Sequence, residues 1–244
     1  MTFIMSFLTN NGISMASDSK MTNLPSYSVD NNLDFRKTNY FNDYQFGVSI
    51  WGKLKFKRTW FWDWFYKTIK FFFKNHSNLE QLTKFLADEL NNLKLTIKTG
   101  IHFTFYKEID KVKYPVIYHI TNDREDLTFQ SQEDCVLLNS KPPFLLINGA
   151  YEPFSNAYST LREYVLEVRD KFLDAKQKTP ALLETGRTRN SKLLKECEYI
   201  ISTLRQYQAI MEMTGVKRII GEPINAICFN ETGIIKEYSK IHFL

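Results

Sequence analysis

Two kinds of apolar spacing alternate along this chain in blocks. In some blocks apolar residues recur at every second position, as in half-buried strands, and in others at helical spacing. The order is strands, two helices, strands, two helices and strands again. Such an order is typical of two antiparallel sheets covered by helices. The sequence therefore predicts an α+β fold, a four-layer αββα sandwich of two antiparallel sheets flanked by helices.

The expected strands are short, and most of them form pairs joined by turn residues. They are residues 3–8, 13–17, 36–41, 46–51, 101–106, 116–121, 144–147, 224–229 and 234–238. Asn10-Asn11-Gly12 is a tight-turn signal for the first pair, and residues 230–233 close the last one. Residues 111–115 are expected to form the turn of the middle pair. The polar residues 20–34 predict a loop or a short irregular hairpin.

The expected helices are residues 59–73, 79–93, 156–175 and 192–213. The first of them is apolar on nearly all sides, which indicates burial on more than one face. Ser77, with Glu80 three residues later, predicts a capping box at the start of the second. Residues 176–191 are polar and contain Pro180 and Gly186, so we expect a flexible insertion there within one domain that spans residues 1–244.

Charge and composition exclude several classes of function. The formal net charge of +5 is spread along the chain, and without a basic face and a reading element it argues against nucleic-acid binding. The three cysteines and four histidines show no ligand spacing, so no metal site is expected. The N-terminal residues lack the basic start of a signal peptide, and no apolar stretch is long enough to span a membrane. A cytoplasmic protein is expected.

The first residues offer a route to a nucleophile. Removal of Met1 would leave Thr2 with a free α-amine beside its hydroxyl. The amine titrates near neutrality and can take the proton of the hydroxyl. A nearby lysine ammonium would keep the amine neutral by charge repulsion, and an aspartate would fix the lysine. Backbone N–H groups at a glycine turn can stabilise an oxyanion.

Several segments carry residues of these types in a familiar order. They are Met1-Thr2, Ala16-Ser17-Asp18-Ser19-Lys20, Phe35-Arg36-Lys37, Gly52 after a strand, and Ile219-Ile220-Gly221-Glu222-Pro223-Ile224-Asn225 near the end. In these segments the chain resembles the proteasome β-subunit and HslV family of N-terminal-nucleophile (Ntn) hydrolases, and it is most similar to the bacterial Anbu branch. The resemblance implies Thr2 as nucleophile, Asp18 and Lys37 as catalytic residues, Gly52 as oxyanion donor and Lys20 as a helper.

The resemblance also implies an activity and partners. It implies a threonine peptidase that cleaves peptides or unfolded proteins without a metal or an organic cofactor. It implies a homo-oligomer, in a ring, an open ring or a helical assembly. Whether an ATPase feeds such an assembly cannot be read from the chain.

The sequence also departs from the family pattern. Trp51 stands where the family favours a small residue, Lys53 follows the glycine, and Ala150 replaces a helper serine. For the helper carboxylate, Glu212 is the nearest candidate. Two alternatives therefore stay open. One is a catalytically inactive structural or regulatory subunit of a proteasome-like assembly, and the other is a basic interaction module that binds nucleic acid or protein.

Overall fold

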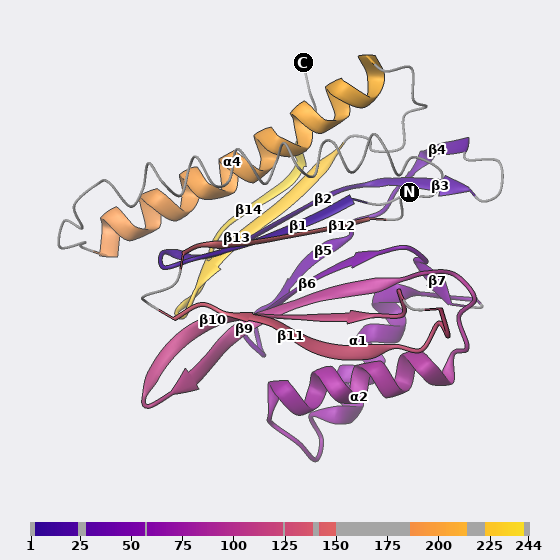
Figure 1. Ribbon diagram of the computed structural model, residues 1–244, viewed down its shortest axis with the longest axis horizontal. Coiled ribbons are helices and arrows are strands. Elements are labelled where there is room, and N and C mark those ends of the chain that lie inside the picture. Colours follow the sequence, from indigo (N-terminus) through magenta and orange to yellow (C-terminus); the bar gives the residue numbers. More distant parts are fainter. Residues whose placement is uncertain are drawn as a thin grey trace.

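The strands form two stacked antiparallel sheets with helices on both outer sides (Figure 1). The computed structural model describes residues 3–23, 28–56, 58–123, 125–138, 142–149, 186–213 and 223–241. Of these, residues 20–23, 28–34, 149, 186–188, 207, 209–213, 240 and 241 are described by their backbone alone. Helix α4 lies over one sheet, and α1 and α2 lie under the other. The predicted α+β class and layer order are confirmed.

The first sheet has the strand order β12-β1-β2-β13-β14. Its strands are β1 (Phe3–Thr9), β2 (Gly12–Asp18), β12 (Phe144–Gly149), β13 (Ile224–Asn230) and β14 (Gly233–Ile241). The opening pair β1–β2 and the closing pair β13–β14 are the two hairpins expected from their turn residues. Since β13 also pairs with β2, the first and the last hairpin of the described chain lie side by side in this sheet.

The second sheet has the strand order β11-β10-β9-β6-β5. Its strands are β5 (Thr38–Phe41), β6 (Phe46–Trp51), β9 (Gly100–Ile109), β10 (Val112–Thr121) and β11 (Gln130–Val136). Two short hairpins stand apart from it, and they are β3 (Lys20–Asn23) with β4 (Ser28–Asp34) and β7 (Lys55–Phe56) with β8 (Thr59–Trp60). The hairpin β3–β4 fulfils the prediction for residues 20–34.

Three helices are described. They are α1 (Phe61–Phe72), α2 (Leu79–Asn92) and α4 (Gly186–Met213). Phe61, Phe65 and Phe72 on α1 pack with strand residues such as Phe46 and Phe103, which gives the second sheet an aromatic underside. The stripe that α4 turns to the first sheet consists of Leu193, Cys197, Ile200, Ile201 and Leu204.

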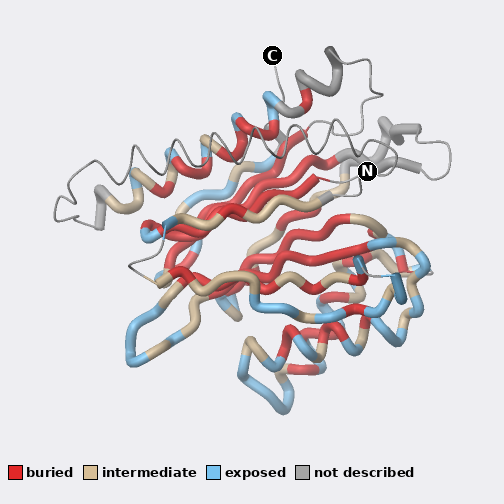
Figure 2. Tube along the Cα trace, viewed as in Figure 1, coloured by how far each residue is buried: buried red, intermediate tan, exposed pale blue. Residues whose placement is uncertain are grey.

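Buried residues fall into three clusters that match the gaps between layers (Figure 2). One lies between the second sheet and α1–α2, one between the first sheet and α4, and one between the sheets. Neighbouring residues of β6 face opposite sides of the second sheet. Val48 and Ile50 face the helices, since they belong to the cluster with α1 and α2. Ser49 therefore faces the first sheet. Because neighbouring residues of a strand face opposite sides, each sheet supplies apolar side chains both to the layer between the sheets and to the layer under its helices. A chain with 43% apolar residues can therefore fill three layers of core.

Some predicted boundaries are wrong. Asn78, not Ser77, caps α2, because its Oδ1 accepts the backbone N–H groups of Glu80 and Gln81 at 2.8 and 3.0 Å. Residues 59–60 belong to β8, so α1 starts at Phe61. The turn between β9 and β10 is at Asp110 and Lys111, both with positive φ, which is typical of a two-residue hairpin loop.

The β10 strand therefore includes Pro115, which was expected to end a turn. Pro115 lies just outside the part of β10 that pairs with β11, which begins at Val116, and its carbonyl accepts the N–H of Leu137 at 2.9 Å. Strand β11 was missed, because its sequence Gln-Ser-Gln-Glu-Asp-Cys-Val is mostly polar and lies at the sheet edge. No apolar alternation marks this segment.

Two expectations concern residues that are not described, or only in part. The helix expected at residues 156–175 lies wholly outside the described residues. Of the expected insertion at residues 176–191, the part from Gly186 onward belongs to α4, and the rest is not described. Within the described residues, no helix is long and apolar enough to cross a membrane.

Candidate functional site

A buried ion pair lies at the end of the first sheet where β1 begins. The Lys37 Nζ is 3.0 Å from the Asp18 Oδ2, and both side chains are 0% exposed. Asp18 closes β2, and Lys37 immediately precedes β5, so the pair joins the two sheets. The other carboxylate oxygen, Oδ1, accepts the backbone N–H of Phe3 at 2.8 Å. The first residue of β1 is therefore bound directly to this pair.

Burial sets the electrostatics of the pair. Desolvation raises the pKa of the Asp18 carboxyl, while the charge of Lys37 and the Phe3 N–H oppose that rise. Desolvation likewise lowers the pKa of the Lys37 ammonium, and the attraction of Asp18 opposes that fall. Each charge therefore depends on the other. A lysine with a lowered pKa is also suited to a role in proton transfer.

Gly52 lies at the corresponding end of the second sheet. The backbone N–H of Ile50 donates to the carbonyl of Lys37 at 2.9 Å. Gly52 comes directly after the last residue of β6, Trp51, and has a φ of +86°. A Cβ at Gly52 would lie 2.7 Å from the Thr99 Cα and closer still to the Lys98 carbonyl. Only glycine fits this bend. The structure thus brings Asp18, Lys37 and Gly52 to one end of the sandwich.

Ser19 and Asn225 support the same region. The Asn225 Nδ2 donates to the Ser19 Oγ at 2.5 Å, and the Ser19 carbonyl accepts the N–H of Phe35, two residues before Lys37. Asn225 is 5% exposed and Ser19 is fully buried. Both occur in segments that carry the family resemblance, but no pattern in the sequence indicates that they are in contact.

A second polar chain crosses between the sheets and was not predicted. The Ser6 Oγ lies 2.9 Å from the His102 Nδ1, and the His102 Nε2 lies 2.7 Å from the Asn148 Oδ1. Because the amide oxygen only accepts, His102 holds its proton on Nε2 and accepts the Ser6 hydroxyl proton on Nδ1. Burial, with the neighbouring His119, lowers the pKa of His102 well below its usual value. The only signal in the sequence was a serine at an inward-facing position of a strand that is otherwise apolar.

Trp51 and His119 extend this polar region. The Trp51 Nε1 points to the His119 Nε2 at 3.4 Å, and Trp51 is only 2% exposed. Its indole occupies the space beside Gly100, where a Cβ would come within 2.6 Å of the Trp51 Cε2. Trp51, which departs from the family pattern, thus lies buried with its indole against Gly100. Burial lowers the pKa of His119 to about 4.

The two buried histidines predict a loss of stability in acid. An unfolded histidine takes up a proton near pH 6.5, whereas folded His119 resists until about pH 4. The unfolded state thus binds more protons in this window, and stability falls as the pH drops from 6.5 to 4. We expect the titration of His119 alone to lower the free energy of unfolding by about 1 kcal/mol for each pH unit in this window. Urea unfolding at several pH values measures it.

His119→Gln is the matched variant, because glutamine keeps an acceptor for Trp51 but does not titrate. Wild-type stability should fall more steeply than that of the variant between pH 6.5 and 4. Asp134, whose pKa burial raises to about 6, acts in the opposite direction but is present in both proteins. Parallel curves for the two proteins would contradict the assignment.

The remaining predicted site residues are less informative. Thr2 lies outside the described residues, Lys20 is the first residue of β3, and Glu212 lies in the last turn of α4. The side chains of Lys20 and Glu212 are not described. Among the side chains that the structure describes, no three His, Cys, Asp or Glu residues are grouped so that they could hold a metal ion.

Comparisons with known proteins do not show which family this chain belongs to. No family model matches the chain, and no curated protein matches it. Among solved structures, an Anbu mutant from Hyphomicrobium sp. strain MC1 superposes with a TM-score of 0.48 at 10% identity, over 99% of this chain and 87% of that one. A likeness at this level says nothing about the chemistry of this chain.

Proposed function

We propose that this chain is an N-terminal threonine hydrolase that cleaves peptide bonds, with Thr2 as nucleophile after removal of Met1. The observation that carries the proposal is the fully buried Lys37–Asp18 pair, bound to the backbone N–H of Phe3. Thr2 is bonded to Phe3 through that same nitrogen. A cation and a carboxylate held out of water next to this residue favour acid–base chemistry there.

In the proposed reaction, the Thr2 Oγ attacks the carbonyl carbon of the scissile bond. The free α-amine of Thr2 takes the hydroxyl proton and passes it to the leaving amine. This forms an ester between Thr2 and the acyl part of the substrate, and a water molecule hydrolyses the ester with the amine again acting as base. The reaction needs no metal or organic cofactor.

The buried pair has two roles in this proposal. The Lys37 ammonium disfavours a proton on the α-amine and attracts the negative charge that develops during attack. Asp18 holds Lys37 in place and compensates its charge. The backbone at Gly52 is proposed to supply the oxyanion donor, because the glycine bend lies at the same end of the sandwich. The helper roles expected of Lys20 and Glu212 stay predictions.

Treatment with a threonine-directed β-lactone probe tests the proposal by intact mass. We expect one adduct on a chain without Met1 in the wild type and in Thr2→Ser, and none in Thr2→Ala. Thr128→Ala, at an exposed threonine on a surface loop, is the control and should keep the adduct. An unmodified chain that retains Met1 would favour the inactive structural subunit.

The expected homo-oligomer belongs to the same proposal, since enclosure restricts a peptidase to peptides and unfolded chains. Light scattering on the purified protein measures it. A monomer without an adduct that binds nucleic acid with steep salt dependence would favour the basic interaction module instead.

A further inference from the structure

A surface cavity of about 500 Å³ lies beside α1, the helix that packs under the second sheet. It is lined by Arg58, Thr59, Asp63, Tyr66, Lys67 and Lys70. All of these residues except Thr59 are exposed, so the cavity is open to solvent. None of them takes part in the proposed hydrolase chemistry. We call this feature the α1 cavity.

Two elements build the α1 cavity. Four of the lining residues recur at helical spacing on the exposed face of α1, and they are Asp63, Tyr66, Lys67 and Lys70. Arg58 comes from the hairpin β7–β8, directly before β8. This wall is anchored, because the Trp62 Nε1 donates to the Arg36 carbonyl at 2.5 Å and the Trp60 ring stacks on Phe35 at 5.4 Å. The cations are thus carried by a fixed backbone.

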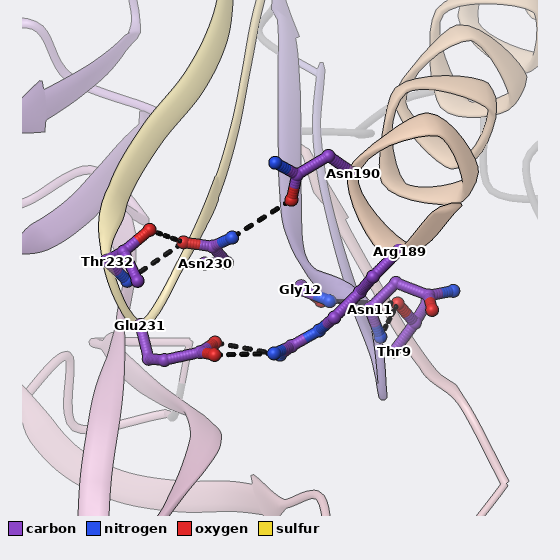
Figure 3. Close-up of polar contacts among 8 residues, drawn as sticks. All are labelled: Thr9, Asn11, Gly12, Arg189, Asn190, Asn230, Glu231 and Thr232. Carbon is purple, nitrogen blue, oxygen red and sulfur yellow. Dashed lines mark hydrogen bonds and ion pairs between the residues drawn. The ribbon is translucent and has the colours of Figure 1, made fainter. Parts of the chain in front are cut away.

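The charges in the α1 cavity are not balanced. Its three cations, Arg58, Lys67 and Lys70, stand against a single carboxylate, Asp63. Within the described part of the chain, none of the three cations forms an ion pair. Arg189 shows the contrast, since it makes a two-pronged ion pair with Glu231 at 2.5 and 2.7 Å (Figure 3). Three like charges around one cavity repel one another, and an anionic ligand relieves that repulsion.

We propose that the α1 cavity is a docking site for an acidic segment of a partner protein. Lys67 and Lys70 lie about 4.5 Å apart along the helix axis, so neighbouring carboxylates of one segment can pair with both. Arg58 can hold a further carboxylate through two parallel hydrogen bonds. Tyr66, which is 43% exposed, offers an aromatic ring to the apolar part of the same segment. The proposal does not depend on the hydrolase activity.

Asp63 favours a peptide over a nucleic acid as the occupant. Its carboxylate belongs to the lining and repels a phosphate group. A peptide segment also supplies backbone N–H donors, which a carboxylate accepts, whereas the phosphates of a nucleic acid supply only acceptors. A lining of three cations and one acceptor therefore matches an acidic peptide.

Binding of a fluorescein-labelled hexaglutamate peptide to the full chain, followed by fluorescence anisotropy, tests the proposal. Lys67→Gln combined with Lys70→Gln should weaken binding about tenfold, because each exposed charge pair contributes about two- to fivefold. The matched control is Lys113→Gln combined with Lys195→Gln, at two exposed lysines outside the cavity. It removes the same total charge and should change the affinity less than about twofold. Equal losses in the two double variants, or no binding to the wild type, would overturn the docking site.

Two further measurements locate the peptide and test the class of partner. Carbodiimide joins carboxylates to lysine amines, so mass spectrometry should find the peptide linked to Lys67 or Lys70. Cross-links to lysines outside the cavity alone would contradict the proposal. A uridine RNA of twelve nucleotides should bind more weakly than the peptide. An RNA that binds more tightly and loses affinity in the Lys67 and Lys70 variant would replace the acidic protein with a nucleic acid.

Discussion

Lys37→Met is expected to lower the free energy of unfolding by about 3–5 kcal/mol. The substitution leaves the Asp18 carboxylate without its counter-charge in a site from which water is excluded. Removing one member of a buried pair is costly for this reason, even where the intact pair adds little net stability. Urea unfolding followed by circular dichroism measures the loss.

Two further variants test this explanation. The surface pair of Lys98 and Asp123 has a similar distance, 2.8 Å, but its side chains are 48% and 34% exposed. Lys98→Met should therefore change stability by less than about 1 kcal/mol. Adding Asp18→Asn to Lys37→Met should recover much of the loss, because asparagine is neutral and its oxygen can still accept the Phe3 N–H. A double variant no more stable than Lys37→Met would show that unpaired charge is not the cause.

Gly52→Ala is expected to cost about 2–4 kcal/mol of unfolding free energy. Part of the cost is conformational, because an L-residue at a φ of +86° is strained by about 1–2 kcal/mol. The rest is steric, because the new methyl group would meet the backbone of Lys98 and Thr99, which cannot move aside without disturbing the start of β9. Thermal and urea unfolding both measure the effect.

Gly233 provides a matched control. It also has a positive φ, +126°, but a Cβ there would meet nothing within 4 Å. Gly233→Ala should therefore show only the conformational cost of about 1–2 kcal/mol. If the two variants lose equal stability, the close approach of Lys98 and Thr99 to Gly52 does not contribute.

Local signals in the sequence predicted much of the fold. The hairpins β1–β2 and β13–β14 follow from alternating apolar residues around Asn10-Asn11-Gly12 and residues 230–233. Helices α1 and α2 follow from helical spacing, with an error of two residues at the start of α1 and of one residue at the cap of α2. Strand β11 could not be predicted in this way, because among the described strands it pairs with β10 alone, and it exposes most of its polar side chains.

The candidate site depends on contacts that local patterns do not encode. Asp18 and Lys37 were singled out by resemblance to a family, and nothing in their spacing indicates that two charges will meet with no exposed surface. Ser6 and His102 are 96 residues apart, and each looks like an ordinary strand residue. Their contact forms only when the two sheets stack, so only the three-dimensional structure reveals it.

The close fit between Trp51 and Gly100 has a consequence for the descent of this protein. Gly100 carries no side chain because the indole of Trp51 already fills its place, and the two positions face each other across β6 and β9. In relatives, a smaller residue at position 51 should therefore permit a side chain at position 100, whereas a tryptophan should require glycine. The two positions should thus be inherited as a pair, so that substitution at either one alone is rare.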